Sequence, residues 1–164
     1  MATLDRIIGT YRAPAATWEA MFDEGTREDR ALAHLIGGCV LAFLSFLPFL
    51  AREAHLTGAD LNMLLGGALF GWMFIAPLLA YVLSLIIYIP LKFIMNLSGA
   101  QVRRILFWSF FAATPLLLIF GLIRGLLGEG SASSAVGVLW LMAVIWGLST
   151  GIRAGGRYAK HELA

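Results

Sequence analysis

The pattern of hydrophobic and polar residues divides the chain into four long apolar runs joined by short polar links. The longest run, residues 62–91, contains thirty residues without one charged side chain. A helix of that length measures about 45 Å, which exceeds the roughly 30 Å hydrocarbon core of a bilayer. The run lacks the period-two alternation of a barrel strand. The pattern predicts an all-α fold, a polytopic membrane helical bundle with four transmembrane helices at about residues 31–50, 62–91, 105–127 and 135–152.

The flanking segments predict a simple division of the chain. In residues 1–30, apolar residues recur at three- and four-residue spacing, which predicts a short amphipathic N-terminal helical region on the cytoplasmic side. This region either lies on the membrane or a partner, or folds back on the bundle of its own chain. Thr26 is expected to cap the first span. Residues 31–154 form the four-helix transmembrane domain, and residues 155–164 form a polar cytoplasmic tail that is expected to fray.

The distribution of basic residues predicts how the bundle is oriented. Ten of the twelve lysines and arginines lie before the first run, between the second and third, or after the fourth. Cytoplasmic loops of membrane proteins carry the excess of basic residues. We therefore predict a multi-pass protein of the cell inner membrane with both termini in the cytoplasm.

Prolines and arginines inside or beside the runs suggest local features. Pro77 and Pro115 are expected to kink their helices, because proline cannot donate to the helix ladder. Arg124 is the only charge well inside an apolar run, and its long side chain can extend to the headgroups or pair with Glu129. The predicted lipid-headgroup contacts are Arg103, Arg104 and Arg124.

Glycines spaced four residues apart predict faces where helices approach closely. In lipid, small residues let two helix backbones come together, and dispersion then drives their association. Such faces serve either packing within the bundle or docking against another subunit. The predicted helix-packing or partner residues are Gly67, Gly71, Gly121, Gly125, Gly147 and Gly151.

The remaining composition offers no set of groups for catalysis. No Asp or Glu lies inside a run, which argues against proton relays and ion coupling. The hydroxyls in the runs have no histidine or carboxylate at matching depth, and the single cysteine, Cys39, has no ligand cluster around it. A formal charge of +2 is too small to suggest nucleic-acid binding. We expect a non-enzymatic protein with no catalytic residue, cofactor or metal.

One stretch carries a resemblance to a known family. The segment LIIYIPLKFIMNLSGAQVRRILFWSFFAATPLLL begins in the last part of a long aromatic-rich span with a central proline, Pro77. It combines a Ser98–Gly99 turn, Arg103 at the start of the next helix, and the small-small-x-Pro element that ends at Pro115. In these features the chain resembles the Yip1 family of small multispanning membrane proteins, bacterial branch. That resemblance implies a scaffolding or accessory role in the membrane and carries over no catalytic residues.

The eukaryotic relatives of that family bind prenylated Rab GTPases and act in vesicle traffic. They contain a D-L-Y-G-P segment and usually five spans, and this sequence has neither. We therefore expect no Rab partner.

These features lead to one preferred function and two alternatives. The preferred hypothesis is an accessory, assembly or scaffolding subunit that docks onto a larger inner-membrane complex, respiratory or photosynthetic, with membrane lipids as its other partners. One alternative is a small dimeric transporter of lipids or small molecules that uses the kinks at Pro77 and Pro115. The other is a lipid-organising protein that uses Arg124 and the basic pair Arg103 and Arg104.

Overall fold

The computed structural model describes residues 3–25 and 27–162, so the predicted cap Thr26 lies outside the described residues. Every regular element in this part of the chain is helical, which confirms the all-α prediction. The elements are α1 (Thr3–Arg12), α2 (Pro14–Asp23), α3 (Glu28–Thr57), α4 (Leu61–Phe70), the π-helical turn η1 (Gly71–Ile75), α5 (Ala76–Met95), α6 (Gly99–Leu127) and α7 (Ser131–Glu162).

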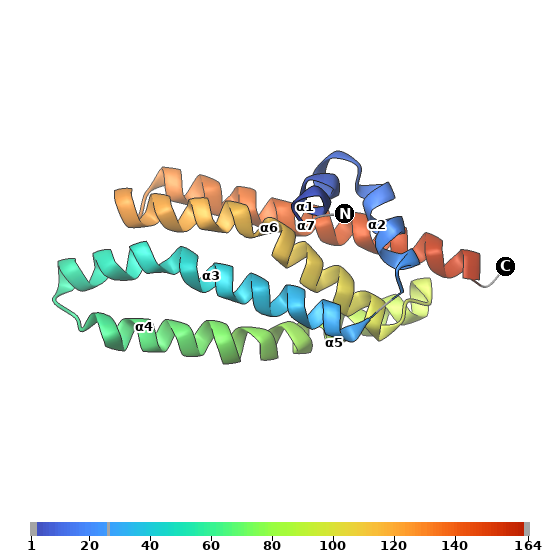
Figure 1. Ribbon diagram of the computed structural model, residues 1–164, viewed down its shortest axis with the longest axis horizontal. Coiled ribbons are helices and arrows are strands. Elements are labelled where there is room, and N and C mark those ends of the chain that lie inside the picture. Colours follow the sequence, from blue (N-terminus) through green and yellow to red (C-terminus); the bar gives the residue numbers. More distant parts are fainter. Residues whose placement is uncertain (1–2, 26, 163–164) are drawn as a thin grey trace.

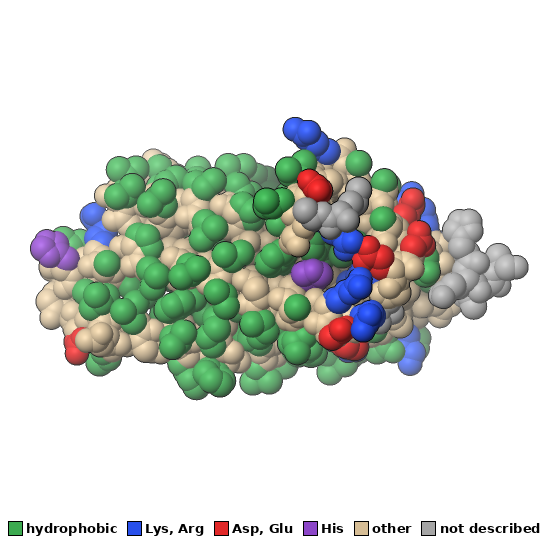
Figure 2. Space-filling view, in the orientation of Figure 1, with side chains coloured by type: hydrophobic (Ala, Val, Ile, Leu, Met, Phe, Trp, Pro, Cys, Tyr) green, Lys and Arg blue, Asp and Glu red, His purple; other side chains and the backbone are tan. Residues whose placement is uncertain are grey.

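Four of these helices are long and apolar enough to cross a membrane, counting α4, η1 and α5 as one continuous helix. Each extends beyond the predicted apolar span at one or both ends. The space-filling view shows hydrophobic side chains over the middle of the molecule and charged side chains towards its two ends (Figure 2). This distribution suits a helical bundle whose central band contacts lipid tails.

Helix α6 lies at the centre of the bundle (Figure 1). In its most apolar stretch 56% of the residues are buried, whereas only 6% are buried in the continuous helix from α4 to α5. Helices α3, α5 and α7 all pack on α6. The continuous helix from α4 to α5 therefore contacts the bundle along one side, and most of its surface is exposed.

Helices α3 and α6 come into backbone contact near the end where α6 finishes. A Cβ atom added at Gly121 would lie 1.7 Å from the carbonyl oxygen of Ser45, and one added at Gly125 would lie 2.3 Å from Cβ of Pro48. Only glycine permits this approach. The predicted Gly121–Gly125 seam is therefore a packing contact inside the bundle.

Two prolines stand beside irregular hydrogen bonding. Pro77 lies at the start of α5, directly after η1, where the helix has widened to π geometry. Pro115 lies inside α6, which changes direction partway along its length in Figure 1. Proline leaves the Phe111 carbonyl without its usual backbone donor. The Thr114 hydroxyl donates to that carbonyl at 2.7 Å and so satisfies it.

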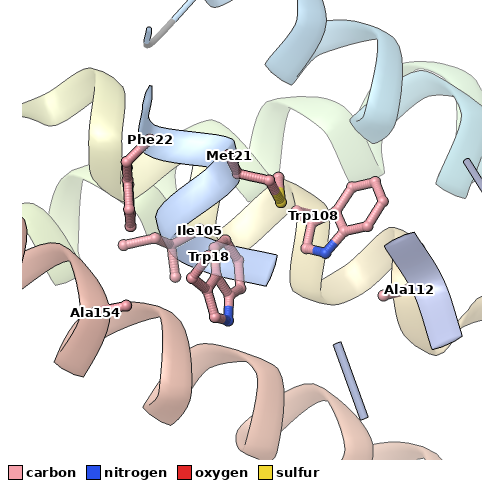
Figure 3. Packing of buried hydrophobic residues seen from close by; sticks show 7 residues of the cluster. All are labelled: Trp18, Met21, Phe22, Ile105, Trp108, Ala112 and Ala154. Carbon is pink, nitrogen blue, oxygen red and sulfur yellow. The ribbon is translucent and has the colours of Figure 1, made fainter. Parts of the chain in front are cut away.

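The N-terminal helices fold back on their own bundle, which is one of the two predicted alternatives. Helix α2 buries Trp18, Met21 and Phe22 against α6 and α7. Figure 3 shows Trp18 and Phe22 close to Ile105 of α6, and Met21 beside Trp108; Ala154 of α7 belongs to the same cluster. The Trp18 indole N–H donates to the Thr150 hydroxyl at 3.1 Å. Helix α2 is thus part of the hydrophobic core.

The prediction that residues 155–164 form a frayed tail is wrong for the described part of that segment. Helix α7 continues to Glu162. Ala154 and Ala159 are buried, and a Cβ atom at Gly155 would lie 2.9 Å from Leu97 and 3.3 Å from Phe22. The small residues of this segment let α7 pack tightly against α2 and the α5–α6 link.

Candidate functional site

A polar pocket opens at the end of the bundle where the chain enters α3. Its volume is about 470 Å³. Helix α1, the segment between α2 and α3, and the first turns of α3 and α6 form its walls. The residues that line it are Thr3, Arg6, Glu24, Arg30, His34, Arg104 and Trp108.

Glu24 is the acidic centre of this pocket. Its carboxylate accepts hydrogen bonds from Nη1 of Arg6 at 3.0 Å and from Nη1 of Arg30 at 2.9 Å. The guanidinium of Arg104 lies 3.8 Å from the same carboxylate. The hydrogen bond from Arg6, aided by the positive charges of all three arginines, holds the pKa of the Glu24 carboxyl below its usual range. Glu24 therefore stays ionised at neutral pH.

Arg104 is the most deeply placed of the three arginines. Its side chain is 2% exposed, and one of its terminal nitrogens donates to the carbonyl oxygen of Gly25. Among the described residues, its Nε has no hydrogen-bond partner, and neither has Nδ1 of His34, which lines the same pocket. The His34 ring packs edge-on against Trp108, with ring centroids 4.8 Å apart. Two buried polar atoms thus remain unpaired in a pocket with excess positive charge.

A larger groove of about 610 Å³ lies near the end of α7 and contains Arg153, Arg157 and Lys160 among its lining residues. These three side chains are exposed to solvent. Burial does not strengthen their electrostatic interactions as it does for Arg104.

A second candidate surface lies on the outer side of α4. We define this surface, the α4 face, by Met63, Gly66, Gly67, Phe70 and Phe74. Beyond the adjoining residues and backbone of their own helix, Cβ atoms added at Gly66 and Gly67 would meet no described atom within 4 Å, and the same holds for the neighbouring Gly71. Phe70 and Phe74 are 58% and 65% exposed and stack with centroids 5.5 Å apart.

The predicted glycines therefore fall into two groups. The pairs on α6 and α7 are packed: added Cβ atoms at Gly147 and Gly151 would lie 2.8 Å from Ser109 and 2.7 Å from Ile105. Gly121 and Gly125 contact α3, as described above. Gly67 and Gly71 make no comparable contact within this chain.

The three predicted headgroup arginines do not form one site. Arg103 is bonded to Glu28 and lies outside the pocket, whereas Arg104 lies within it. Arg124 lies at the opposite end of the bundle, where it pairs with Glu129 and stacks 4.1 Å above the Phe49 ring.

Sequence reasoning missed Arg6, Glu24, Arg30 and His34 as parts of one pocket. The sequence signal for this pocket is weak, because acidic and basic residues in an amphipathic segment normally face water. These residues belong to α1, to the segment after α2 and to the start of α3, and only the fold brings them together.

The described residues contain no group of three or more His, Cys, Asp or Glu side chains placed to hold a metal ion. Cys39 is buried in the interface between α3 and α6. The pocket is lined by three guanidinium groups, and groups of this kind can bind an anion.

Comparisons with known proteins add no family or relative to this picture. No protein-family model matches the sequence, and neither the curated proteins nor the solved structures contain a match. The resemblance to the Yip1 family remains a prediction from the sequence pattern.

Proposed function

We propose that this chain is a non-enzymatic accessory or scaffolding subunit of a larger inner-membrane complex and that it docks through the α4 face. The observation that supports the proposal is the open space around Gly66, Gly67 and Gly71. Glycine in a helix interior is about 1 kcal/mol less favourable than alanine. Three glycines within six residues therefore weaken α4 without any packing gain inside this chain.

Contact with lipid alone does not explain that composition. Lipid tails pack against leucine or isoleucine as well as against glycine, whereas a second helix gains from the close approach that glycine allows. The bundle uses its other glycine pairs in this way, on α6 and α7. The exposed rings of Phe70 and Phe74 extend the α4 face by one to two turns and offer apolar area to a partner helix.

The proposed orientation places both termini in the cytoplasm. The concentration of ten of the twelve basic residues in the segments on that side supports it. The α4 face then begins at the outer end of the bundle and extends towards the middle of the membrane.

The experiment is affinity purification of the tagged chain from native membranes in a mild detergent, with wild type and Gly67→Leu compared. Leucine at this position fills open space and favours the helix, so the chain itself should remain folded. We expect wild type to recover a membrane complex at fixed stoichiometry and Gly67→Leu to lose most of it. Ala135→Leu, at an exposed small residue of α7, is the matched control and should retain the complex.

Three results would contradict the proposal. Equal recovery by Gly67→Leu and Ala135→Leu would remove the α4 face as the docking surface. A wild-type chain that is always monomeric and free of partners would remove the accessory role. Recovery of only a second copy of this chain would make the face a homodimer contact and favour the alternative of a small dimeric transporter.

A further inference from the structure

We propose that the pocket formed by Arg6, Arg30, Arg104 and His34 binds a phosphate group, presented by the headgroup of an anionic phospholipid or by a small soluble phosphate. This site is separate from the α4 face, so either proposal can fail without the other. Its chemistry is recognition of an anion by guanidinium groups, which match phosphate oxygens in geometry and charge.

The charge balance of the pocket is the first argument. Three guanidinium groups line it against the single carboxylate of Glu24, and with His34 counted as neutral the lining residues carry a net +2. Glu28, the next acid along the chain, is bonded to Arg103 instead, and Asp29 lies 3.5 Å from Arg27. A dianionic phosphate would balance the remaining charge.

The unpaired buried atoms are the second argument. Nε of Arg104 is a charged donor in a side chain that is 2% exposed, and it has no partner in the part of the chain that the structure describes. Leaving a buried donor unsatisfied costs about 1–3 kcal/mol, and more when the group is charged. An oxyanion in the pocket would accept from Nε of Arg104 and from Nδ1 of His34 in its protonated-Nδ1 form. The pocket therefore has buried donors that Glu24 does not use.

The position of the pocket suits a lipid headgroup. Arg104 is five residues beyond Gly99, the first residue of α6, which is about 8 Å along the helix axis. Arg30 lies in the first turn of α3. Next to the pocket, α1 exposes Leu4 and Ile8, which are 71% and 50% exposed, as an interfacial helix does. A volume of about 470 Å³ also lies within the usual range of small-ligand sites, roughly 300–1,000 Å³.

The test measures ligand retention by the full chain in a neutral detergent, using native mass spectrometry and titration. The probes are phosphatidic acid, phosphatidylcholine and inorganic phosphate. We expect wild type to bind phosphatidic acid at least about tenfold more tightly than phosphatidylcholine. Arg30→Gln should lower the affinity for phosphatidic acid about tenfold, since one charge-assisted hydrogen bond is lost.

Arg27→Gln is the matched control. It removes the same charge three residues away, but Arg27 is not among the residues that line the pocket and its side chain is 62% exposed. It should leave the affinity unchanged. Arg30 is itself 46% exposed, and within the described residues its side chain bonds only to Glu24, so its replacement is compatible with folding. If Arg30→Gln fails to fold, His34→Phe, which removes the Nδ1 donor, replaces it with the same expectation.

The three probes distinguish the two possible sources of the phosphate group. Binding of phosphatidic acid that millimolar inorganic phosphate does not displace assigns the pocket to a lipid headgroup. Binding of inorganic phosphate alone, lost in Arg30→Gln, assigns it to a soluble phosphate. Equal losses in Arg30→Gln and Arg27→Gln would show general attraction of negative charge and overturn the site. Equal binding of phosphatidic acid and phosphatidylcholine by wild type, with no binding of inorganic phosphate, would also overturn it.

Discussion

Gly121 and Gly67 are each followed by a second glycine four residues later, yet the surroundings of the two residues differ completely. An added Cβ at Gly121 would overlap the Ser45 carbonyl oxygen of α3, whereas one at Gly67 would meet nothing within 4 Å. The sequence pattern identifies both as small residues suited to close packing. Which of them packs inside the chain depends on the neighbours that the fold supplies.

Alanine at these two positions should therefore have opposite effects on stability. Gly121→Ala forces the backbones of α3 and α6 apart and should lower the free energy of unfolding by about 1–3 kcal/mol. Gly67→Ala should leave the free energy unchanged or raise it by up to about 1 kcal/mol through helix propensity. Thermal unfolding of both variants in the same detergent measures the difference. Equal stability of the two variants would contradict the α3–α6 contact.

Hydrogen bonds at Pro115 show what the sequence predicts at this scale. A proline in a helix must free the carbonyl four residues earlier, here that of Phe111. The donor that satisfies it, the Thr114 hydroxyl, is adjacent in sequence, and such local bonds from threonine are common. The Tyr11 hydroxyl donates to the next carbonyl, Ala112, at 3.0 Å from 101 residues away. No local pattern predicts that contact.

At the scale of elements, the pair α1 and α2 behaves as a cap on α6 and α7. Hydrogen bonds attach this pair to the bundle. The Trp18 indole N–H donates to the Thr150 hydroxyl at 3.1 Å, and the Trp108 indole N–H donates to the Thr10 hydroxyl at 3.0 Å. Trp18 is fully buried. Because α1 also supplies Arg6, release of this cap would open one wall of the polar pocket that Arg6 lines with Arg30 and Arg104.

Trp18→Ala should release the cap while the four long helices remain in place. Loss of a buried tryptophan costs about 3–5 kcal/mol. The variant should be cleaved by trypsin after Arg12 and Arg27 several-fold faster than wild type. Trp146→Ala, on the 49% exposed tryptophan of α7, is the control and should be cleaved at the wild-type rate. Identical cleavage rates for all three proteins would show that α2 does not depend on Trp18 for docking.

The elements also show where hydropathy stops being informative. Four apolar runs predict four spans because each run alone is long enough for lipid. The last part of α7 reads as a polar, glycine-rich tail, and its helix depends on Phe22 and Leu97, which approach Gly155 closely. The turn η1 is likewise invisible to periodicity, since Gly71 starts it within an unbroken apolar run.

At the scale of the whole molecule, the two ends of the bundle differ in charge. One end carries the N-terminal helices and ten of the twelve basic residues, and the other carries Arg52 and Arg124. A bundle inserted with the richly basic end in the cytoplasm satisfies the usual charge bias of membrane proteins.

Labelling with a membrane-impermeant maleimide tests this orientation. His55→Cys places a thiol in the last turns of α3, and Lys160→Cys places one near the end of α7; both positions are exposed. In spheroplasts we expect labelling of His55→Cys only, with Lys160→Cys labelled after lysis. The native Cys39 is 1% exposed and serves as the unreactive background. The reverse pattern would invert the proposed topology.

The contacts between α2 and α7 have a consequence for how the protein is made. The Trp18 indole bonds to a residue 132 positions later in the chain, and Tyr11 to one 101 positions later. During synthesis the N-terminal helices emerge first, while the surfaces that receive them do not yet exist. The side chains of Trp18, Met21 and Phe22 therefore stay without their full set of contacts until the ribosome has completed α7. Helices α1 and α2, translated before the four long helices, are thus among the last elements to reach their final place, and a chain truncated before α7 would leave these side chains without their site.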